Sequence, residues 1–308
     1  MLKSVRPVIR STPVSRRSSI PPGALANSRK STAARPDSPA AGTAWSRPHL
    51  RNRVGMTALA VVVTLCCQLG GMASAGSLRL GEVARIIDGD TLILVSGETI
   101  RLAGINTPEL GYQGRPDEPL ARQARNALRA QLVSGSVGIE DASQNRDRHG
   151  RTLAYLFTSD GTSVQRALLR QGLASTVAIS PNDRYLEQFI QAEHTAWRAD
   201  RGIWGLPYYV PRSADRARGG YQFIYDRVSR IKIGKKWFAF SLGGEFMILI
   251  RRADWKAYFA YPPAALDQAA VAVRGWVSKK KTRARLVLNH PFMLERCGTD
   301  PQRLCPAD

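Results

Sequence analysis

The sequence predicts a mainly β protein with helices, of the α+β class, in which two small β-barrels follow one another along the chain. Two observations support this. Between residues 79 and 205, strand-like runs lie on both sides of a helical pattern, and two further helical patterns close the segment. Between residues 220 and 296, five strand-like runs surround one short helical pattern. A chain of 308 residues has room for two ordinary domains, each with a buried core.

Residues 1–53 are rich in Ser, Arg, Pro and Ala, and they hold eleven Lys or Arg against one acid, Asp37. They show neither a helical nor a strand period, so we expect this segment to be disordered. It is either a basic arm that binds nucleic acid or the result of a translation start assigned too far upstream, and we favour the second interpretation.

Residues 54–75 have the pattern of an export signal. Arg51 and Arg53 precede an uncharged run with an apolar centre at 58–69, and the run ends in the small residues 73–75 (Ala-Ser-Ala). An uncleaved membrane anchor is the alternative, because the uncharged run is nearly long enough to span a bilayer. Both interpretations place the remainder outside the cytoplasm, either secreted or periplasmic, or anchored to the membrane and facing outward.

The segment 79–205 is predicted to be one compact domain, a small barrel capped by helices. Turn-like residues 88–90 and 96–98 separate its first strands. Gly172 and Gly202 are candidate helix ends. The expected strands are 83–87, 91–95, 99–105, 136–140 and 152–157, and the expected helices are 120–132, 163–171 and 185–199.

An aperiodic stretch, 206–219, is the expected linker to the second unit, 220–296. Its expected strands are 221–233, 237–242, 245–250, 271–277 and 285–288, with a helix at 253–259. Three strands, a helix and two strands is the order of a five-stranded OB barrel. A tail, 297–308, follows, and Cys297 and Cys305 would form a disulfide there in an oxidising compartment; two free thiols are the alternative.

The formal net charge of +21 points to polyanionic partners such as nucleic acid or an anionic membrane. Without residues 1–53 the chain still holds 34 basic and 23 acidic residues, so its charge remains +11. No protein partner is implied, and a membrane is implied only if the segment 54–75 is an uncleaved anchor.

Three polar motifs lie within the first predicted barrel. The turn 88–90, Asp-Gly-Asp, can present a carboxylate to a hard cation, although such turns are also common in plain hairpins. The stretch 101–109, R-L-A-G-I-N-T-P-E, crowds oxygen-bearing residues around a corner stiffened by proline. The turn 146–151, R-D-R-H-G-R, is by itself best explained as a solvated charge run.

Together the motifs supply what phosphodiester hydrolysis requires. Charge must be neutralised on the reacting phosphate, and a group must direct the attacking water. Arginine suits phosphate because its planar fork donates two parallel hydrogen bonds and stays charged. A divalent cation bound by the acids would add Lewis acidity.

In their order and spacing, the motifs I-D-G-D-T, R-L-x-G-I-N-T-P-E and D-x-x-G-R-x-L-A-Y resemble the staphylococcal nuclease (thermonuclease) family over residues 83–205. The resemblance implies an OB-fold five-stranded barrel capped by helices. It also implies a calcium-dependent endonuclease acting on DNA, RNA or both, while a non-catalytic nucleic-acid-binding protein that retains the barrel is the alternative.

The resemblance assigns roles to individual residues. Asp90 and the Thr107 carbonyl match the family's calcium ligands, and Asn106 stands where the family has a second carboxylate. Arg101 matches the arginine that grips the scissile phosphate, Arg151 matches the one that stabilises the transition state, and Glu109 matches the acid that activates or orients water.

Asn106 keeps a carbonyl oxygen but loses a negative charge, so the affinity for calcium is expected to be weaker than in the family's type enzyme. Residues 176–179 (Thr-Val-Ala-Ile) also lack the tyrosines against which that enzyme stacks a nucleotide base.

Further substrate-binding candidates are Arg148 in the arginine turn and Lys235 and Lys236 in the second unit. In that unit aromatic residues alternate with basic ones. This pattern indicates either a groove that holds single-stranded nucleic acid or a small core with a solvated basic rim, and the sequence does not separate the two. The residues are Tyr221, Phe223, Tyr225, Trp237, Phe238 and Trp276, with Arg227, Arg230, Lys232, Arg274 and Lys279 to Lys281.

Overall fold

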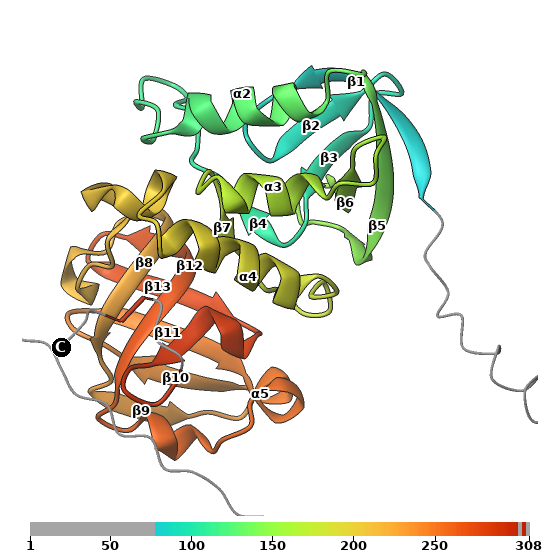
Figure 1. The fold of residues 1–308 in the computed structure, drawn as a ribbon. Coiled ribbons are helices and arrows are strands. Elements are labelled where there is room, and N and C mark those ends of the chain that lie inside the picture. The colour runs from blue at the N-terminus through green and yellow to red at the C-terminus, as the bar shows by residue number, and fades with distance from the viewer. Residues whose placement is uncertain (1–77, 301–303, 306–308) are drawn as a thin grey trace, which may run out of the picture. The chain divides into compact units, whose positions relative to one another are not determined.

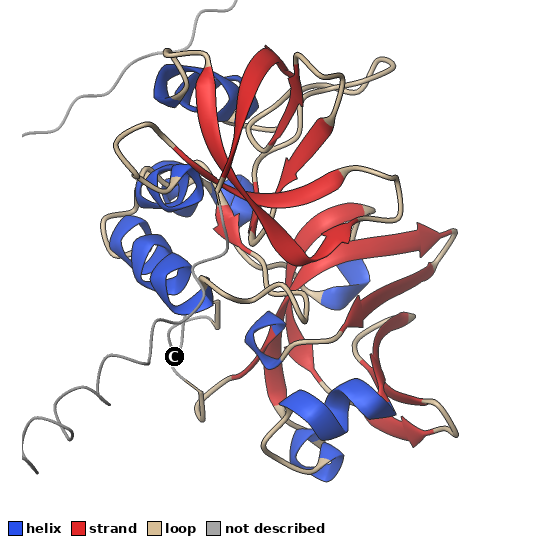
Figure 2. Ribbon diagram, turned by 90° about the vertical axis from the view of Figure 1, so that its right-hand side faces the viewer, coloured by secondary structure: helices blue, strands red, loops and turns tan. Residues whose placement is uncertain are grey.

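The computed structural model describes residues 78–300 and 304–305 (Figures 1 and 2). The predicted disordered segment 1–53 and the predicted export signal or anchor 54–75 lie outside these residues. In the described part of the chain, no helix is both long and apolar enough to cross a membrane.

Residues 79–157 form the predicted closed barrel of five strands, in the order β1-β2-β3-β6-β5. The strands are β1 (Arg79–Ile86), β2 (Thr91–Leu94), β3 (Thr99–Leu102), β5 (Ser136–Arg146) and β6 (Thr152–Phe157). Strands β3 and β6 pair in parallel and the other neighbours are antiparallel, which is the strand order of an OB fold. The first predicted barrel is therefore confirmed.

Three helices cover this barrel: α2 (Ala121–Gln131), α3 (Val164–Arg170) and α4 (Leu186–Trp197) (Figure 1). Helix α2 buries Ala121, Ala124 and Leu128 because their spacing of three and four residues places them on one face. Ser163 begins α3 by accepting a hydrogen bond from the Arg166 N–H.

Both predicted glycine positions lie where the backbone turns back at the end of a helical segment. Gly172 adopts a φ of +67° just after α3, and its N–H donates to the Leu169 carbonyl. Gly202 adopts a φ of +63° five residues after α4 ends and begins a short 3₁₀ turn, Gly202–Gly205. The two glycines touch, because a Cβ on either would lie 2.1 Å from a backbone oxygen of the other segment.

A two-stranded ladder lies beside the barrel. Strand β4 (Ile105–Asn106) pairs antiparallel with β7 (Ser175–Thr176). The pairing fixes the corner that follows β3 against the segment between α3 and α4. That corner carries three of the predicted site residues.

The second unit contains β8 (Gly220–Arg227), β9 (Arg230–Ile233), β10 (Trp237–Ser241), β11 (Phe246–Arg251), β12 (Ala270–Lys280), β13 (Arg283–Leu288) and β14 (Leu294–Arg296). Helix α5 (Arg252–Tyr258) lies between β11 and β12, as α2 does between the third and fourth barrel strands of the first unit. Short 3₁₀ turns cover Pro263–Leu266 and Pro291–Met293, and two more, Pro207–Tyr209 and Ala214–Arg216, lie in the predicted linker.

The strand order repeats that of the first barrel. Strands β9, β10, β11, β13 and β12 follow one another, β11 pairs in parallel with β13, and β8 pairs with the far side of β12. The first strand is interrupted at Val228 and Ser229, so its two halves, β8 and β9, each pair with a different edge. The OB-like unit is thus a seven-stranded sheet rather than a ring of continuous pairing.

Each unit has its own buried cluster, and the segment after β7 joins them. Val177 and Ala178 belong to the apolar core of the second unit. These two residues of the first unit therefore complete the core of the second.

In the tail, Cys297 and Cys305 are linked by a disulfide and pack beside Phe223.

A buried ion pair also links the two units. Glu193 on α4 and Arg274 on β12 are 2% and 1% exposed, and Arg274 Nη1 lies 2.8 and 2.9 Å from the two carboxylate oxygens. The same carboxylate accepts the Thr176 N–H at 2.7 Å. The Arg274 guanidinium lies over the Phe292 ring at 4.7 Å. Arg274 is therefore buried, whereas both interpretations of the sequence, a basic groove and a solvated basic rim, placed it at the surface.

Removing one partner of this pair should destabilise the protein strongly. Glu193→Ala leaves the Arg274 charge buried without its counter-ion, and the free energy of unfolding in urea should fall by about 3–5 kcal/mol. The matched control is Arg122→Ala, which removes the exposed Arg122–Asp117 pair and should leave the unfolding midpoint unchanged. A small effect of Glu193→Ala, comparable to that of the control, would contradict this account.

Candidate active site

The turn between β1 and β2 carries the first predicted site residue. Asp88 Oδ1 accepts the Asp90 N–H at 3.0 Å, which shapes the turn, and Asp90 points inward with 2% of its surface exposed. Asp90 Oδ1 accepts the Thr91 hydroxyl at 3.2 Å, and Oδ2 accepts the Thr107 N–H at 2.8 Å. The carboxylate therefore ties the turn to the corner after β4.

Gly89 allows this turn to pack closely. A Cβ on Gly89 would lie 2.6 Å from Ala124 Cβ on α2 and 2.7 Å from the Thr107 hydroxyl oxygen. Any side chain at this position would push the turn away from both. The glycine is thus required by a close approach of backbone to two neighbours.

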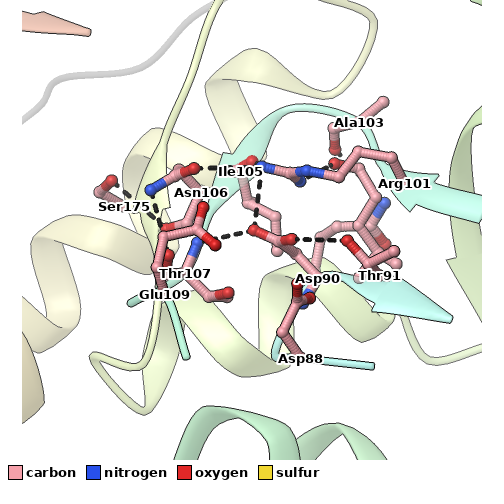
Figure 3. Close-up of polar contacts among 12 residues, drawn as sticks. Asp88, Asp90, Thr91, Arg101, Ala103, Ile105, Asn106, Thr107, Glu109 and Ser175 are labelled. Atoms are coloured by element: carbon pink, nitrogen blue, oxygen red, sulfur yellow. Dashed lines mark hydrogen bonds and ion pairs between the residues drawn. The ribbon is translucent and has the colours of Figure 1, made fainter. Parts of the chain in front are cut away.

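Arg101 projects from β3 into the same region and is 7% exposed (Figure 3). Its Nη1 donates to the carbonyls of Leu102 and Ile105 at 2.8 and 3.1 Å. Its Nη2 lies 2.9 Å from Asp90 Oδ2 and 3.1 Å from Asn106 Oδ1. Two backbone carbonyls therefore fix the plane of the guanidinium, and its Nη2 end faces Asp90 and Asn106.

Asn106 and Thr107 lie at the corner that follows β4. The Asn106 Nδ2 group donates to the Thr107 carbonyl at 3.1 Å, and the Ser175 hydroxyl donates to the Asn106 carbonyl at 3.5 Å. The Asn106 side-chain oxygen and the Thr107 carbonyl oxygen each accept one hydrogen bond. Since a carbonyl oxygen has two lone pairs, each retains capacity for a cation.

The carboxyl groups of Asp90 and Glu109 are held in a buried environment beside Asp88 and Arg101. Burial raises the pKa of Asp90 to about 7, the Arg101 charge opposes this rise, and the neighbouring charges of Asp88 and Glu109 add to it. Burial of the Glu109 carboxyl likewise raises its pKa, and Asp88 adds to that shift. Carboxylates crowded in this way are stabilised by a nearby cation.

The donor set fits a hard divalent cation such as calcium. Asp90, the Asn106 side-chain oxygen and the Thr107 carbonyl are all oxygen donors, the type that calcium prefers. Within the described residues, no group of three or more His, Cys, Asp or Glu side chains is arranged to hold a metal. A cation here would consequently depend on carbonyl and water oxygens beside a small number of carboxylates.

Arg151 is the last residue of the turn 146–151, and Asp147 holds its side chain. Its Nε is 2.7 Å from Asp147 Oδ2, while Asp147 Oδ1 accepts the N–H groups of Arg151 and His149 at 3.0 and 2.8 Å. These hydrogen bonds help to hold the pKa of Asp147 below its usual range, although burial opposes them. The exposed Arg148 donates through Nε to the His149 ring at 3.0 Å.

One cavity of about 530 Å³ brings most of the predicted residues together. Asp90, Arg101, Glu109, Arg148 and Arg151 all line it, and Asn106 and Thr107 line a small cavity of about 10 Å³ instead. Lys235 and Lys236 lie in the turn between β9 and β10 and line neither cavity.

The second unit forms part of the wall of the large cavity, which reasoning from the sequence missed. Its contribution comes from β12, β13 and the residues just after them. The lining residues are Gly275, Trp276, Ser278, Arg285, Val287, Leu288, Asn289 and Met293. The sequence did show alternating apolar and polar residues on β12 and β13. Such alternation identifies the two faces of a strand but does not reveal which face meets another unit.

Comparisons with known proteins agree with this geometry. The model of the family described as staphylococcal nuclease homologue matches residues 99–205. The thermonuclease of Staphylococcus hyicus is 31% identical over 157 residues, covering 47% of this chain and 92% of the relative. The thermonuclease of Staphylococcus intermedius is 33% identical, covering 48% and 92%. Endonuclease YncB of Bacillus subtilis (strain 168) is 35% identical over 131 residues, covering 41% and 62%.

Substitution of Gly89 should disturb the site and the fold together. In Gly89→Ala the new methyl group overlaps Ala124 and Thr107, so the free energy of unfolding should fall by about 1–3 kcal/mol. Chemical denaturation followed by circular dichroism measures this. Gly219→Ala is the control, since a Cβ there meets only the Val277 oxygen at 3.9 Å. Equal stability of the two variants would refute the close-packing explanation.

Proposed function

We propose, from the premise that the chain belongs to the staphylococcal nuclease family, that this nuclease is an exported, metal-dependent endonuclease acting on DNA, RNA or both. It hydrolyses phosphodiester bonds, as its relatives named thermonuclease and endonuclease indicate. The observation that carries the proposal is the convergence of Arg101, Glu109 and Arg151 on one cavity beside the buried Asp90 carboxylate.

In this proposal Arg101 binds the scissile phosphate. The two carbonyls that accept from Nη1 prevent the guanidinium from rotating, so little conformational freedom is lost when a phosphate arrives. Its Nη2 group now donates to Asp90 and Asn106, and an arriving phosphate oxygen would take over one of these two hydrogen bonds. Arg101 is thus a preorganised anion site with low exposure to water.

Arg151 would stabilise charge that develops on the phosphate and on the leaving oxygen. The Asp147 carboxylate accepts hydrogen bonds from the Nε and the backbone N–H of Arg151, so the turn holds the Arg151 side chain in a set direction. An arginine fixed in advance stabilises a transition state without the cost of reorganising at the moment of reaction.

Glu109 would accept a proton from the attacking water or orient it. Its own N–H donates to Glu118 Oε2 at 3.0 Å, and Glu118 Oε1 accepts the Tyr208 hydroxyl at 3.2 Å. These contacts hold the backbone of Glu109 and leave its carboxylate at the cavity. A carboxylate with a raised pKa is a better proton acceptor near neutral pH than an ordinary one.

Asp90, the Asn106 side-chain oxygen and the Thr107 carbonyl would hold the cation, with calcium the proposed ion. When bound, it supplies Lewis acidity and neutralises phosphate charge. Arg148 would contribute a peripheral phosphate contact, and Lys235 and Lys236 would meet only a longer substrate.

Export is proposed from the segment 54–75, and the Cys297–Cys305 disulfide supports it, since disulfides persist mainly in oxidising compartments. A secreted or periplasmic protein is the first choice, and an outward-facing anchored form is the alternative.

A second candidate function is nucleic-acid binding without catalysis. The observation that favours it is Asn106, which removes one carboxylate from the proposed cation site. Retention of Arg101, Glu109 and Arg151 around one cavity favours catalysis.

The first test is cleavage of DNA and RNA by the form that starts at Gly76, with calcium, with magnesium and with chelator. Arg101→Ala and Glu109→Ala should each lower turnover by about 100-fold or more, because each removes a group that acts on the reacting phosphate or water. Arg122→Ala, an exposed arginine on α2 outside the cavity, should leave turnover unchanged. Binding of DNA by the natural chain without cleavage in any metal would instead establish the binding function.

The second test concerns the cation. Asn106→Asp restores a negative charge beside Asp90, so calcium should bind about tenfold more tightly or better in isothermal titration calorimetry. Asn126→Asp, at an exposed position of α2 outside the cavity, controls for a general effect of added charge and should have a smaller effect. Sub-micromolar calcium binding by the natural chain would show that Asn106 does not weaken the site.

A further inference from the structure

The cavity contains an exposed apolar patch. Ile179, Trp276 and Val287 all line it, although 44%, 39% and 55% of their respective surfaces are exposed. The segment around Ile179 is the one that lacks aromatic residues in the sequence. The aromatic ring in this cavity comes from the second unit instead.

The strand register places this ring beside a cation. On β12 the side chains of Trp276 and Ser278 face outward, while Val277 is buried between them. Ser278 pairs with Arg285 on β13, and Val277 pairs with Leu286, so Val287 stands opposite Trp276. Trp276 and Arg285 are therefore one outward position apart, or roughly 7 Å along the strands.

The outward-facing residues of β12 and β13 form a row that continues to the end of the strand pair. Lys280 pairs with Arg283 one outward position beyond Ser278 and Arg285, and both are exposed. The row thus begins with an apolar ring in the cavity and becomes basic toward the β12–β13 turn. An aromatic followed by cations is the pattern of a surface that tracks single-stranded nucleic acid.

Trp276 is held in place from behind. Tyr221 on β8 meets it edge to face, with ring centroids 5.0 Å apart at 74°. Tyr221 also lines the small cavity formed by Asn106 and Thr107, so a single ring separates Trp276 from the corner of the proposed cation site. Gly275, with a φ of +148° and Leu286 2.8 Å from where its Cβ would lie, admits no side chain in this stretch of β12.

We propose that Trp276 stacks on an unpaired nucleobase of a single-stranded substrate while Arg285 binds a phosphate next to that base. The inference rests on the proposed function and extends it, since it names the substrate form and the residues that hold it. Stacking requires a base whose face is open, which a continuous duplex does not offer. The second unit would thereby supply the base site that the segment 175–182 lacks.

Binding can be measured separately from cleavage. The full chain is titrated in chelator with an oligothymidylate carrying one 2-aminopurine, whose fluorescence is quenched on stacking, and a gel verifies that the oligonucleotide stays intact. Trp276→Ala should weaken binding about tenfold and lose the quenching, and Trp276→Phe, which keeps a ring, should recover most of both. An oligomer of abasic sites should bind equally to the natural chain and to Trp276→Ala.

Trp197→Ala is the matched control. Trp197 on α4 has the same exposed fraction, 39%, but does not line the cavity. Its substitution should change neither binding nor quenching. Arg285→Ala should lower the dependence of log affinity on log salt concentration by about 0.7, the value for one phosphate contact on a single strand.

The outcomes separate this inference from the proposed function. Unchanged affinity and quenching in Trp276→Ala, with cleavage by the natural chain intact, would overturn the stacking role and leave the nuclease proposal standing. Binding that depends on Trp276, in a chain that cleaves nothing, would support the base site and overturn catalysis. Failure of the natural chain to bind the oligonucleotide, or tighter binding of a duplex than of the single strand, would also overturn the inference.

Discussion

The site depends on the buried carboxylate of Asp90. It receives the Thr107 N–H and the Thr91 hydroxyl and faces the Arg101 guanidinium, so it joins the β1–β2 turn, strand β3 and the corner after β4. A charge buried this deeply is tolerated only when paired and hydrogen-bonded. The polar contacts that stabilise the fold here therefore also position the groups proposed for catalysis. Gly89 belongs to the same arrangement, because any side chain there would separate the turn from Thr107.

A second buried charge pair has a comparable role between the units. Glu193 accepts from both Arg274 and the Thr176 N–H, and Thr176 belongs to the ladder that pairs with Ile105 beside the site. Arg274 and Trp276 lie two residues apart on β12, so their side chains share one face of the strand. The ion pair that anchors β12 to α4 consequently fixes the strand that presents Trp276 to the cavity. Removal of the pair would affect the wall of the cavity as well as stability.

The sequence predicted elements and motifs better than it predicted surfaces. Alternation and turn residues located most strands of both units, because these signals are local along the chain, but they did not reveal the short strands β7 and β14. The same alternation made Phe223, Arg274 and Trp276 look equivalent, yet the first two are buried and only Trp276 remains open to the cavity. Which face of a strand meets another unit depends on tertiary packing. For the same reason, the contribution of Arg285 to the cavity and the pairing of Arg151 with Asp147 could not be derived from residue order.

The two units share a strand order but differ in the charge they bring to the cavity. The first contributes Asp88, Asp90 and Glu109, which would repel a polyanionic substrate. Arg101 and the arginines of the 146–151 turn line the same cavity, and Arg285 of the second unit adds a further cation to it. A substrate held by these cations can bring one phosphate to the acids while its other phosphates remain neutralised. A nuclease with acids at its centre gains from a second basic unit, because the substrate must approach a region that its own charge disfavours.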